Sequence, residues 1–389
     1  MIATIKQDLL NDALGIAGMA ISSRTTLPVL RNFLLKAEGD SLVISATDRD
    51  ISVTVCVDAK VKKTGATTLP GDVLSQFVAS VADDIFIEEG KGKWVVSAKK
   101  TTCKLPSIDP YEFPLLREWG DDISIVAQFP GSEIAEIASQ VALAASKDEN
   151  RPVLTGINIE LGGGKAKFVT TDGFRLALRS DDTASQDVFG AILPTSSLKA
   201  ISKAVSVFKR TPASVSIGRF KDHDAEIIAM IEPSEEHGIK RIVISSMLID
   251  GRYPDYGGVI PKEHVQTLTA DRVSLLSAVK TSLLIAKESA NIVSLEIPEL
   301  GKDSEDQQYS LIVSAQSAEM GDMRAEVPAE ATGPIQVSVN GIFLRDSLSV
   351  MTSGKVKIGW SSPTRPITIQ EDGPDDSLLH VIMPMYPPR

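Results

Sequence analysis

Apolar and polar residues alternate in short runs along most of the chain, and longer stretches with helical spacing separate these runs. Residues 41–55 and 166–178 each contain two alternating runs joined by a Thr-Asp pair, which predicts two strands and a turn. Amphipathic spacing predicts helices at 7–20, 71–82, 131–146, 195–207, 271–286 and 341–351. With about three predicted strands for each helix, the pattern indicates an α+β fold.

Polar residues stand near the start of most predicted helices. Side chains of this kind accept hydrogen bonds from the free amide groups of a first helical turn. We therefore predict that the polar residues near these starts accept such bonds, namely Asp8, Asp72, Ser132, Ser196 and Asp271.

The strand pairs are part of an internal repeat. Asp172 follows Asp48 by 124 residues, and Pro194 follows Pro70 by the same distance. A third copy is more divergent, since Gln316-Ser317 replaces the Thr-Asp pair. Repeats at a fixed offset indicate duplicated structural units. We predict three tandem copies of one domain with two helices and a sheet, at residues 1–121, 122–257 and 258–389.

Composition and charge narrow the classes of function. A chain of 389 residues is longer than one core normally organises, which agrees with several domains. The formal net charge of −11 argues against a protein that coats DNA phosphates, but a protein that encloses DNA needs only a mildly positive lining. No apolar run is long enough to span a membrane, and Asp8 and Asp12 interrupt any signal peptide. With Cys56 and Cys103 in strand-like runs, we expect a cytoplasmic protein without membrane contact.

Patterns for catalysis or metal binding are weak. The four histidines have no ligand partners at useful spacing, and Gly162-Gly163-Gly164 joins two predicted strands, as a hairpin turn does. Asp48 and Asp172 occupy equivalent places, which suggests either a carboxylate pair or a duplicated turn. We favour the turn, and we predict no enzyme activity, no metal and no cofactor.

Six short segments, in order along nearly the whole chain, resemble the beta subunits of bacterial DNA polymerase III, the sliding clamps. The segments are 24–35, 46–51, 65–70, 170–178, 250–262 and 381–385. The resemblance implies a head-to-tail homodimeric ring with helices lining the hole and sheets outside. Such a ring encircles duplex DNA without sequence preference and tethers the replicative polymerase, which confers processivity. It also implies the clamp loader and other polymerases and repair factors as partners.

The same resemblance carries over candidate site residues. Partner proteins of the family insert a short hydrophobic peptide at the junction of the second and third domains. That pocket would be lined by Leu154, Thr171, Gly173, Arg175, Leu176, Pro254, Val259, Val381, Met383, Pro384 and Met385. Met side chains adapt to different ligands, which suits such a pocket, although an ordinary interdomain core is the alternative.

Candidate DNA contacts are Arg24, Arg151, Lys199 and Lys203, the last two one helical turn apart. Lys280 and Arg345 are further candidates on helices that otherwise carry few cations. For the dimer interface we name Leu105 on the first domain and Leu283 with Ile285 on the third.

The chain departs from the family pattern at several places. Phe174 stands where the family commonly has His, and Pro152 and Val153 replace aromatic residues. The chain continues past Met-Pro-Met as Tyr386-Pro387-Pro388-Arg389, and we predict that this tail reshapes the pocket. Two alternatives stay open: a ring or dimer scaffold that binds peptides without enclosing DNA, and an enzyme with a domain-junction site around Asp48, Asp172 and Arg175.

Overall fold

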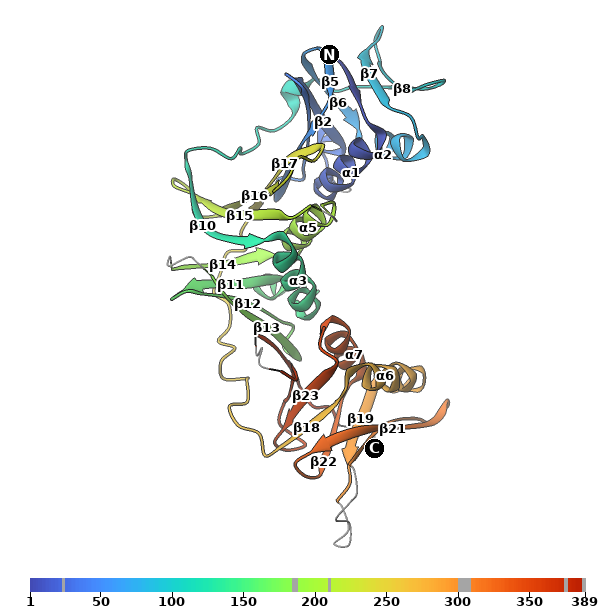
Figure 1. Cartoon of the computed structure of the whole chain (residues 1–389), viewed down its shortest axis with the longest axis vertical. Coiled ribbons are helices and arrows are strands. Elements are labelled where there is room, and N and C mark those ends of the chain that lie inside the picture. The colour runs from blue at the N-terminus through green and yellow to red at the C-terminus, as the bar shows by residue number, and fades with distance from the viewer. Residues whose placement is uncertain (23–24, 184–187, 209–210, 300–308, 374–376, 387–389) are drawn as a thin grey trace. The chain divides into compact units, whose positions relative to one another are not determined.

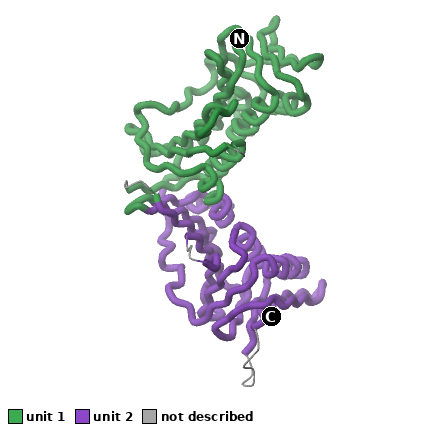
Figure 2. The backbone as a smooth tube through the Cα atoms, in the orientation of Figure 1, with its two compact units in different colours: residues 1–138, 161–164, 183–250 green, residues 139–160, 165–182, 251–389 purple. Residues whose placement is uncertain are grey.

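The computed structural model describes residues 1–22, 25–183, 188–208, 211–299, 309–373 and 377–386. The chain forms two compact units (Figure 2). Unit 1 comprises residues 1–138, 161–164 and 183–250, and unit 2 comprises residues 139–160, 165–182 and 251–389. The predicted second repeat therefore contributes to both units.

Unit 1 contains two antiparallel sheets (Figure 1). The smaller has the order β5 (Lys60–Lys63), β1 (Ile2–Ile5), β7 (Ile85–Glu89), β8 (Trp94–Ala98), β9 (Thr101–Leu105). The larger has the order β10 (Ile123–Pro130), β15 (Ala213–Phe220), β16 (Glu226–Pro233), β17 (Ile239–Met247), β4 (Ile51–Asp58), β3 (Ser41–Thr47), β2 (Asn32–Glu38), β6 (Gly65–Pro70). Helices α1 (Gln7–Ala17), α2 (Gly71–Ser80) and α5 (Thr195–Ser206) belong to this unit, as does strand β14 (Phe189–Pro194).

Unit 2 contains one continuous run of paired strands. Its order is β11 (Gly156–Gly162), β12 (Lys165–Thr171), β13 (Arg175–Asp182), β25 (Leu378–Ile382), β24 (Ile367–Glu371), β23 (Lys355–Trp360), β18 (Gln266–Asp271), β21 (Gly321–Ala331), β20 (Ser310–Ser317), β19 (Ile292–Ile297), β22 (Ile335–Asn340). Helices α4 (Pro152–Thr155), α6 (Arg272–Ala286) and α7 (Gly341–Val350) complete it. Helix α3 (Gly131–Val141) begins in unit 1 and ends in unit 2.

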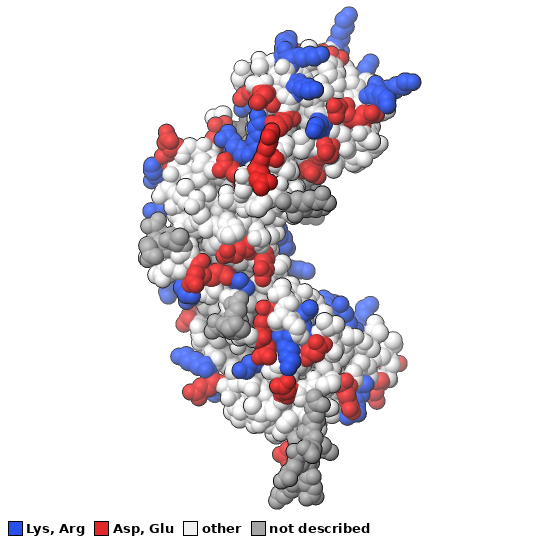
Figure 3. Space-filling view, viewed as in Figure 1, with Lys and Arg blue, Asp and Glu red and all other residues white. Residues whose placement is uncertain are grey.

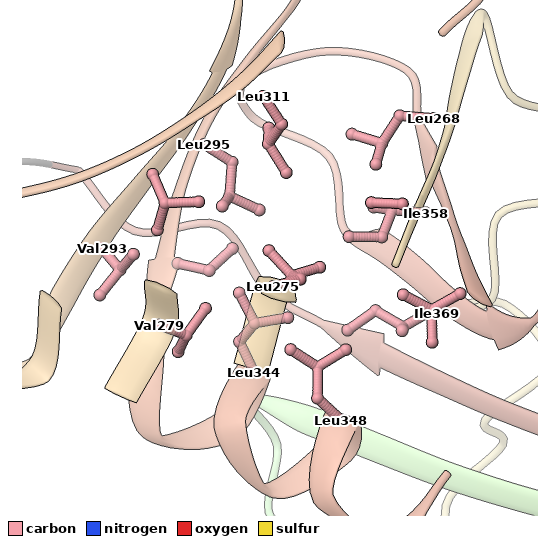
Figure 4. Close-up of a cluster of buried hydrophobic side chains, with 14 of the residues drawn as sticks. Leu268, Leu275, Val279, Val293, Leu295, Leu311, Leu344, Leu348, Ile358 and Ile369 are labelled. Carbon is pink, nitrogen blue, oxygen red and sulfur yellow. The ribbon is translucent and has the colours of Figure 1, made fainter. Parts of the chain in front are cut away.

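Buried apolar side chains from the helices and strands of unit 2 meet in one core. Leu275 and Val279 of α6 and Leu344 and Leu348 of α7 point toward strand residues such as Leu295 (Figure 4). All five are fully buried. Burying a side chain of this size stabilises a fold by about 1.5–3 kcal/mol, so this core holds the two helices against the strands.

The six predicted helices are present and begin within one residue of the predicted starts, but their N-cap residues differ in part from the prediction. Asp271 caps α6 as predicted, because its carboxylate accepts a hydrogen bond from the Ser274 amide at 2.7 Å. Pro70 and Pro194 occupy the N-cap positions of α2 and α5, so Asp72 and Ser196 lie inside the first turn. In both helices the residue that ends the preceding strand and occupies the N-cap position is proline, whose side chain has no hydrogen-bond acceptor. Asp8 likewise lies inside α1, whose N-cap is Lys6.

The Thr-Asp pairs are duplicated turns. Asp48 Oδ1 accepts from the amides of Asp50 and Ile51, while Thr47 Oγ1 donates to the Ile51 carbonyl. In the second copy Asp172 Oδ1 accepts from the amides two and three residues on, and Thr171 Oγ1 donates to the Arg175 carbonyl. These bonds occupy the carboxylates in fixing the chain, as expected for Asp in turns. The prediction of a duplicated turn is confirmed.

The repeats join by one rule within each unit. The last strand of the second repeat, β17, pairs antiparallel with β4 of the first, and we call this contact the first junction. The last strand of the third repeat, β25, pairs antiparallel with β13 of the second, which we call the second junction. The two junctions also share a backbone hydrogen bond at equivalent positions. Met247 N donates to Asp50 O in the first, and Met383 N donates to Phe174 O in the second.

Candidate functional site

A pocket opens at the second junction, inside unit 2. Its volume is about 160 Å³, and we call it the apolar pocket. It is lined by Leu154, Thr171, Gly173, Phe174, Arg175, Leu176, Pro254, Asp255, Tyr256, Val259, Val381 and Met383. The structure thus brings nine of the eleven predicted pocket residues around one cavity. The other two, Pro384 and Met385, continue the chain beyond its wall.

The floor and the rim of the apolar pocket differ in exposure. Leu176 on β13 pairs directly with Val381 on β25, and both side chains are buried. At the rim, Phe174 is 63% exposed and Val259 is 45% exposed. A large apolar side chain this exposed beside an apolar floor offers surface that a ligand can remove from water.

Arg175 ties the pocket wall to helix α7. Its Nε lies 3.1 Å from Asp172 Oδ2, and its Nη1 lies 3.1 Å from Asp346 Oδ2 on α7. The guanidinium also lies over the Phe343 ring, 4.3 Å from its centroid. The side chain is only 12% exposed, so these charge-assisted bonds are shielded from solvent and hold β13 in place.

Two tyrosines from the segment after β17 close the other side. The Tyr253 hydroxyl accepts a hydrogen bond from the Thr171 amide at 3.0 Å, and burial raises the pKa of Tyr253 to about 12. The Tyr256 hydroxyl donates to Glu160 Oε2 at 3.0 Å, and burial together with this carboxylate raises its pKa as well. Both phenols therefore stay neutral; Tyr256 lines the pocket, and Tyr253 holds the strand that carries Thr171.

His380 lies behind the pocket on β25, next to Val381. Its Nε2 lies 3.1 Å from the Gln140 carbonyl, which can only accept, so the proton sits on Nε2. Among the described residues Nδ1 is buried without a partner. Desolvation therefore lowers the pKa of His380 to about 4.

The predicted DNA contacts differ in exposure and in ion pairing. Lys199 and Lys203 are both exposed on α5, whereas Arg151 is bonded to Asp148 at 3.0 Å. Arg24 lies outside the described residues. Lys280 is exposed on α6, and Arg345 is paired with Asp346 at 2.6 Å. On the face in Figure 3, cationic and acidic side chains stand next to one another in both units.

The predicted interface residues occupy two places. Leu105 ends β9, at the edge of its sheet, and is 3% exposed. Leu283 and Ile285 on α6 are half-buried against the core of unit 2. Leu284 between them is 70% exposed, so the apolar side chain of this segment that faces solvent is neither of the two predicted residues.

Sequence reasoning also missed part of the pocket. Phe174 was noted only as a departure, although its position inside the Thr-Asp turn motif was a usable signal. Tyr256 and Asp255 stand next to the selected Pro254. Phe343 and Asp346 gave no signal, because only the fold brings α7 to Arg175.

Metal-binding clusters and membrane-spanning helices are both absent from the described residues. These residues contain no group of three or more His, Cys, Asp or Glu side chains arranged to hold a metal ion. Within the same residues, no helix has the length and apolar character needed to cross a bilayer.

Known proteins resemble this chain along nearly its whole length. Residues 1–117, 128–255 and 258–386 match family models for the N-terminal, central and C-terminal domains of the DNA polymerase III beta subunit. Proteins named Beta sliding clamp are similar, with 26% identity over 388 residues in Synechococcus elongatus and 27% over 376 in Treponema pallidum. These alignments cover 98% of both chains in the first case and 94% of both in the second.

Solved structures show the same fold. The DNA polymerase sliding clamp of Bacillus subtilis has a TM-score of 0.85 at 23% identity, covering 99% of both chains. The DNA polymerase III beta subunit of Thermotoga maritima has a TM-score of 0.85 at 22% identity, covering 99% of this chain and 100% of that one. The predicted α+β fold of three tandem repeats is confirmed by these matches.

Proposed function

The chain belongs to the DNA polymerase III beta-subunit family, and we propose that it is a sliding clamp. Two copies would form a ring that encircles duplex DNA and tethers the replicative polymerase. The observation that carries the proposal is the strand-pairing rule of the two junctions, because it leaves one strand at each end of the chain without its expected partner.

Within the described residues, β9 and part of β21 each have one edge without a partner strand. In both junctions the last strand of one repeat pairs with the strand that follows the turn in the preceding repeat. By this rule β9, the last strand of the first repeat, should pair with a strand equivalent to β4 and β13. In the third repeat that strand is β21. In the described chain β9 pairs only with β8, and residues 321–328 of β21 pair only with β20. An exposed edge of this kind is a template for another strand.

A second copy would satisfy both edges. If β9 of each chain pairs with β21 of the other, the contact joins unlike ends, and two such contacts close a ring. The helices suggest a similar rule, because α1, the first helix of the first repeat, contacts α5, the second helix of the second repeat. The equivalent contact across the ring would join α6 of one copy to α2 of the other. Leu284 on α6 and Val73 on α2 are 70% and 48% exposed, as apolar interface residues should be before assembly.

Retention by such a ring depends on topology. An enclosed duplex cannot leave sideways, so weak contacts suffice and the net charge of −11 is no obstacle. Lys199 and Lys203 are the proposed phosphate contacts, with Arg24 and Arg151 from the family motif. A tethered polymerase meets the primer end again at high effective concentration, which gives processivity without catalysis by the ring itself.

Partners would dock in the apolar pocket. Its buried floor of Leu176 and Val381, with Phe174 at the rim, suits a short hydrophobic peptide. By analogy with the family, the peptides would come from the replicative polymerase, the clamp loader, other polymerases and repair factors. We place the protein in the cytoplasm, with domains at 1–121, 122–257 and 258–389.

The proposal is tested by retention of labelled protein on DNA. The protein is loaded onto nicked circular DNA with a competent clamp loader and then washed in high salt, before and after the circle is cut. Topological enclosure predicts survival on the circle and loss on cutting. Equal retention on both would contradict the proposal and indicate ordinary binding.

A matched pair of variants sharpens this test. Leu284→Lys should abolish retention, because a charge enters the proposed interface. Val265→Lys replaces another exposed apolar side chain, 69% exposed, and should be retained like the parent chain. Peptide binding without retention of the parent chain would favour the scaffold alternative.

A further inference from the structure

A second cavity in unit 2 has a lining unlike that of the apolar pocket. Its volume is about 620 Å³, and we call it the acidic cavity. The residues that line it are Glu288, Ser289, Ala290, Ile292, Ser317, Ala318, Glu319, Met385 and Tyr386. They come from the segment between α6 and β19 with the first residue of β19, from the end of β20 and the turn after it, and from the segment after β25.

The walls of the acidic cavity are held by internal hydrogen bonds. Ser289 Oγ donates to the Gln316 carbonyl at 2.7 Å, which ties the end of α6 to the β20–β21 turn. The Ser317 hydroxyl accepts from the amides of Glu319 and Met320, and Met385 N donates to the Ser338 carbonyl at 2.7 Å. A site fixed in this way loses little freedom when a ligand binds.

The charge of the cavity is negative. Glu288 and Glu319 are both exposed, and in the described part of the chain neither has an ion-pair partner. Glu288 also follows the C-terminal end of α6, where the helix dipole adds negative potential. Lys287 is adjacent in sequence but does not line the cavity. Phosphate groups are therefore disfavoured here, and a cation is favoured.

Apolar and aromatic groups complete the site. Ile292 and Met385 supply apolar surface for the methylene groups of a long side chain. The Tyr386 ring is 77% exposed and can lie against a cationic head group. Carboxylates, aliphatic surface and an exposed ring together match a lysine or arginine side chain.

The acidic cavity is linked to the apolar pocket along the chain. Met383 lines the pocket and Met385 lines the cavity, and a β-bridge between Pro384 and Val339 fixes the segment between them. Two residues of extended chain span about 7 Å. A peptide seated in the pocket therefore needs only a few more residues to reach the cavity.

We infer that the acidic cavity receives a lysine or arginine side chain from the same partner peptide whose hydrophobic residues fill the apolar pocket. This inference rests on the proposed function of the pocket. It adds a requirement on the partner: a basic residue a few positions from the hydrophobic motif.

The test uses the full chain and labelled synthetic peptides in fluorescence anisotropy. Each peptide has the same five-residue core of Leu and Phe, extended at either end by Lys-Lys, Ser-Ser or Glu-Glu. At one end, Lys-Lys should bind about threefold to tenfold more tightly than Ser-Ser, and Glu-Glu more weakly. Because the contacts are exposed, the difference should vanish near 1 M salt, where the Debye length is about 3 Å.

Variants distinguish an effect of the two cavity carboxylates from an effect of the protein's overall negative charge. Glu288→Gln with Glu319→Gln should abolish the preference for Lys-Lys and leave the affinity for the Ser-Ser peptide unchanged. Tyr386→Ala should weaken the preference. Glu263→Gln with Glu296→Gln removes the same charge from exposed positions outside the cavity and should keep it.

The outcomes distinguish the inference from the proposed function. If the Ser-Ser peptide binds but Lys-Lys adds nothing at either end, the inference is wrong and the proposed pocket stands. If both double variants lose the preference equally, general charge explains it and the inference is again overturned. If no peptide binds, the proposed pocket itself fails, and the inference fails with it.

Discussion

The two junctions share one backbone plan but differ in the side chains at equivalent positions. Ser52 pairs with Ser245 at the first junction, and their hydroxyls are hydrogen bonded at 2.6 Å. At the second junction the equivalent pair is Leu176 and Val381. The two serine hydroxyls hydrogen bond to each other, so the first junction is a closed polar contact. Leu and Val side chains form no hydrogen bonds, so the second junction can present an apolar floor.

Three further equivalent positions also differ in residue type. Asp50, Ile51 and Ile244 of the first junction correspond to Phe174, Arg175 and His380 of the second. Beside the first junction, Leu30 and Phe113 also pack into a closed apolar cluster with Val29 and Leu34. The proposed binding site thus differs from the first junction in its side chains and not in its backbone plan, and exchanging residues between the junctions tests this view.

The largest expected effect comes from Arg175→Ile, which installs the residue of the first junction. The change leaves Asp172 and Asp346 without their shared cation, and breaking a partly buried pair of this kind costs about 3 kcal/mol of unfolding free energy. Denaturant unfolding measures it. Adding Asp172→Asn should restore part of the loss, since it removes the carboxylate whose only described ion-pair partner is Arg175, whereas Asp346 keeps Arg345; no restoration would show that the pairing is not the cause.

His380→Ile should remove a pH dependence of stability that the first junction lacks. The pKa of His380 is about 4 in the folded chain and near 6.5 when unfolded. Between these values only the unfolded state binds the proton, so falling pH lowers stability by about 3 kcal/mol in total, with no further change below pH 4. Unfolding at pH 7 and pH 4.5 should show a smaller fall in the variant than in the parent; equal falls would contradict the assignment.

Leu176→Ser combined with Val381→Ser should convert the floor of the pocket into the polar contact of the first junction. We expect at least about tenfold weaker binding of a hydrophobic peptide, which corresponds to about 1.4 kcal/mol. Fluorescence anisotropy measures the affinity, and circular dichroism checks the fold. Ser52→Ala at the first junction is the control and should leave peptide affinity unchanged.

The smallest effect is expected for Phe174→Asp. The Phe174 ring is 63% exposed without ligand and lies at the rim, so a bound peptide would cover only part of it. Losing this partial apolar contact should weaken peptide affinity about twofold to fivefold. The change should not alter stability, because the Phe174 amide and carbonyl make the bonds that hold the turn. Val265→Asp, another exposed apolar residue, should bind peptide like the parent chain.

The sequence by itself determined the repeating units. The Thr-Asp turns recur because their bonds form within four residues, so local spacing encodes them fully. The helices follow from apolar spacing, and their cores could be located to within a few residues. The N-cap residues were less well predicted, because proline occupies that position in α2 and α5, where a polar side chain is usual.

Only the tertiary structure decided what the junctions are. The bond from Arg175 to Asp346 joins residues 171 positions apart, and the bond from His380 to Gln140 joins residues 240 apart. Nothing in local sequence marks such pairs, because their contact depends on how β25 enters the sheet beside β13. The burial of His380 and the exposure of Phe174 follow from this pairing, and the exposure of Leu284 follows from how α6 packs on the core of unit 2. Periodicity determines which face of an element is apolar, whereas packing determines which of those apolar and charged groups are left open to a partner.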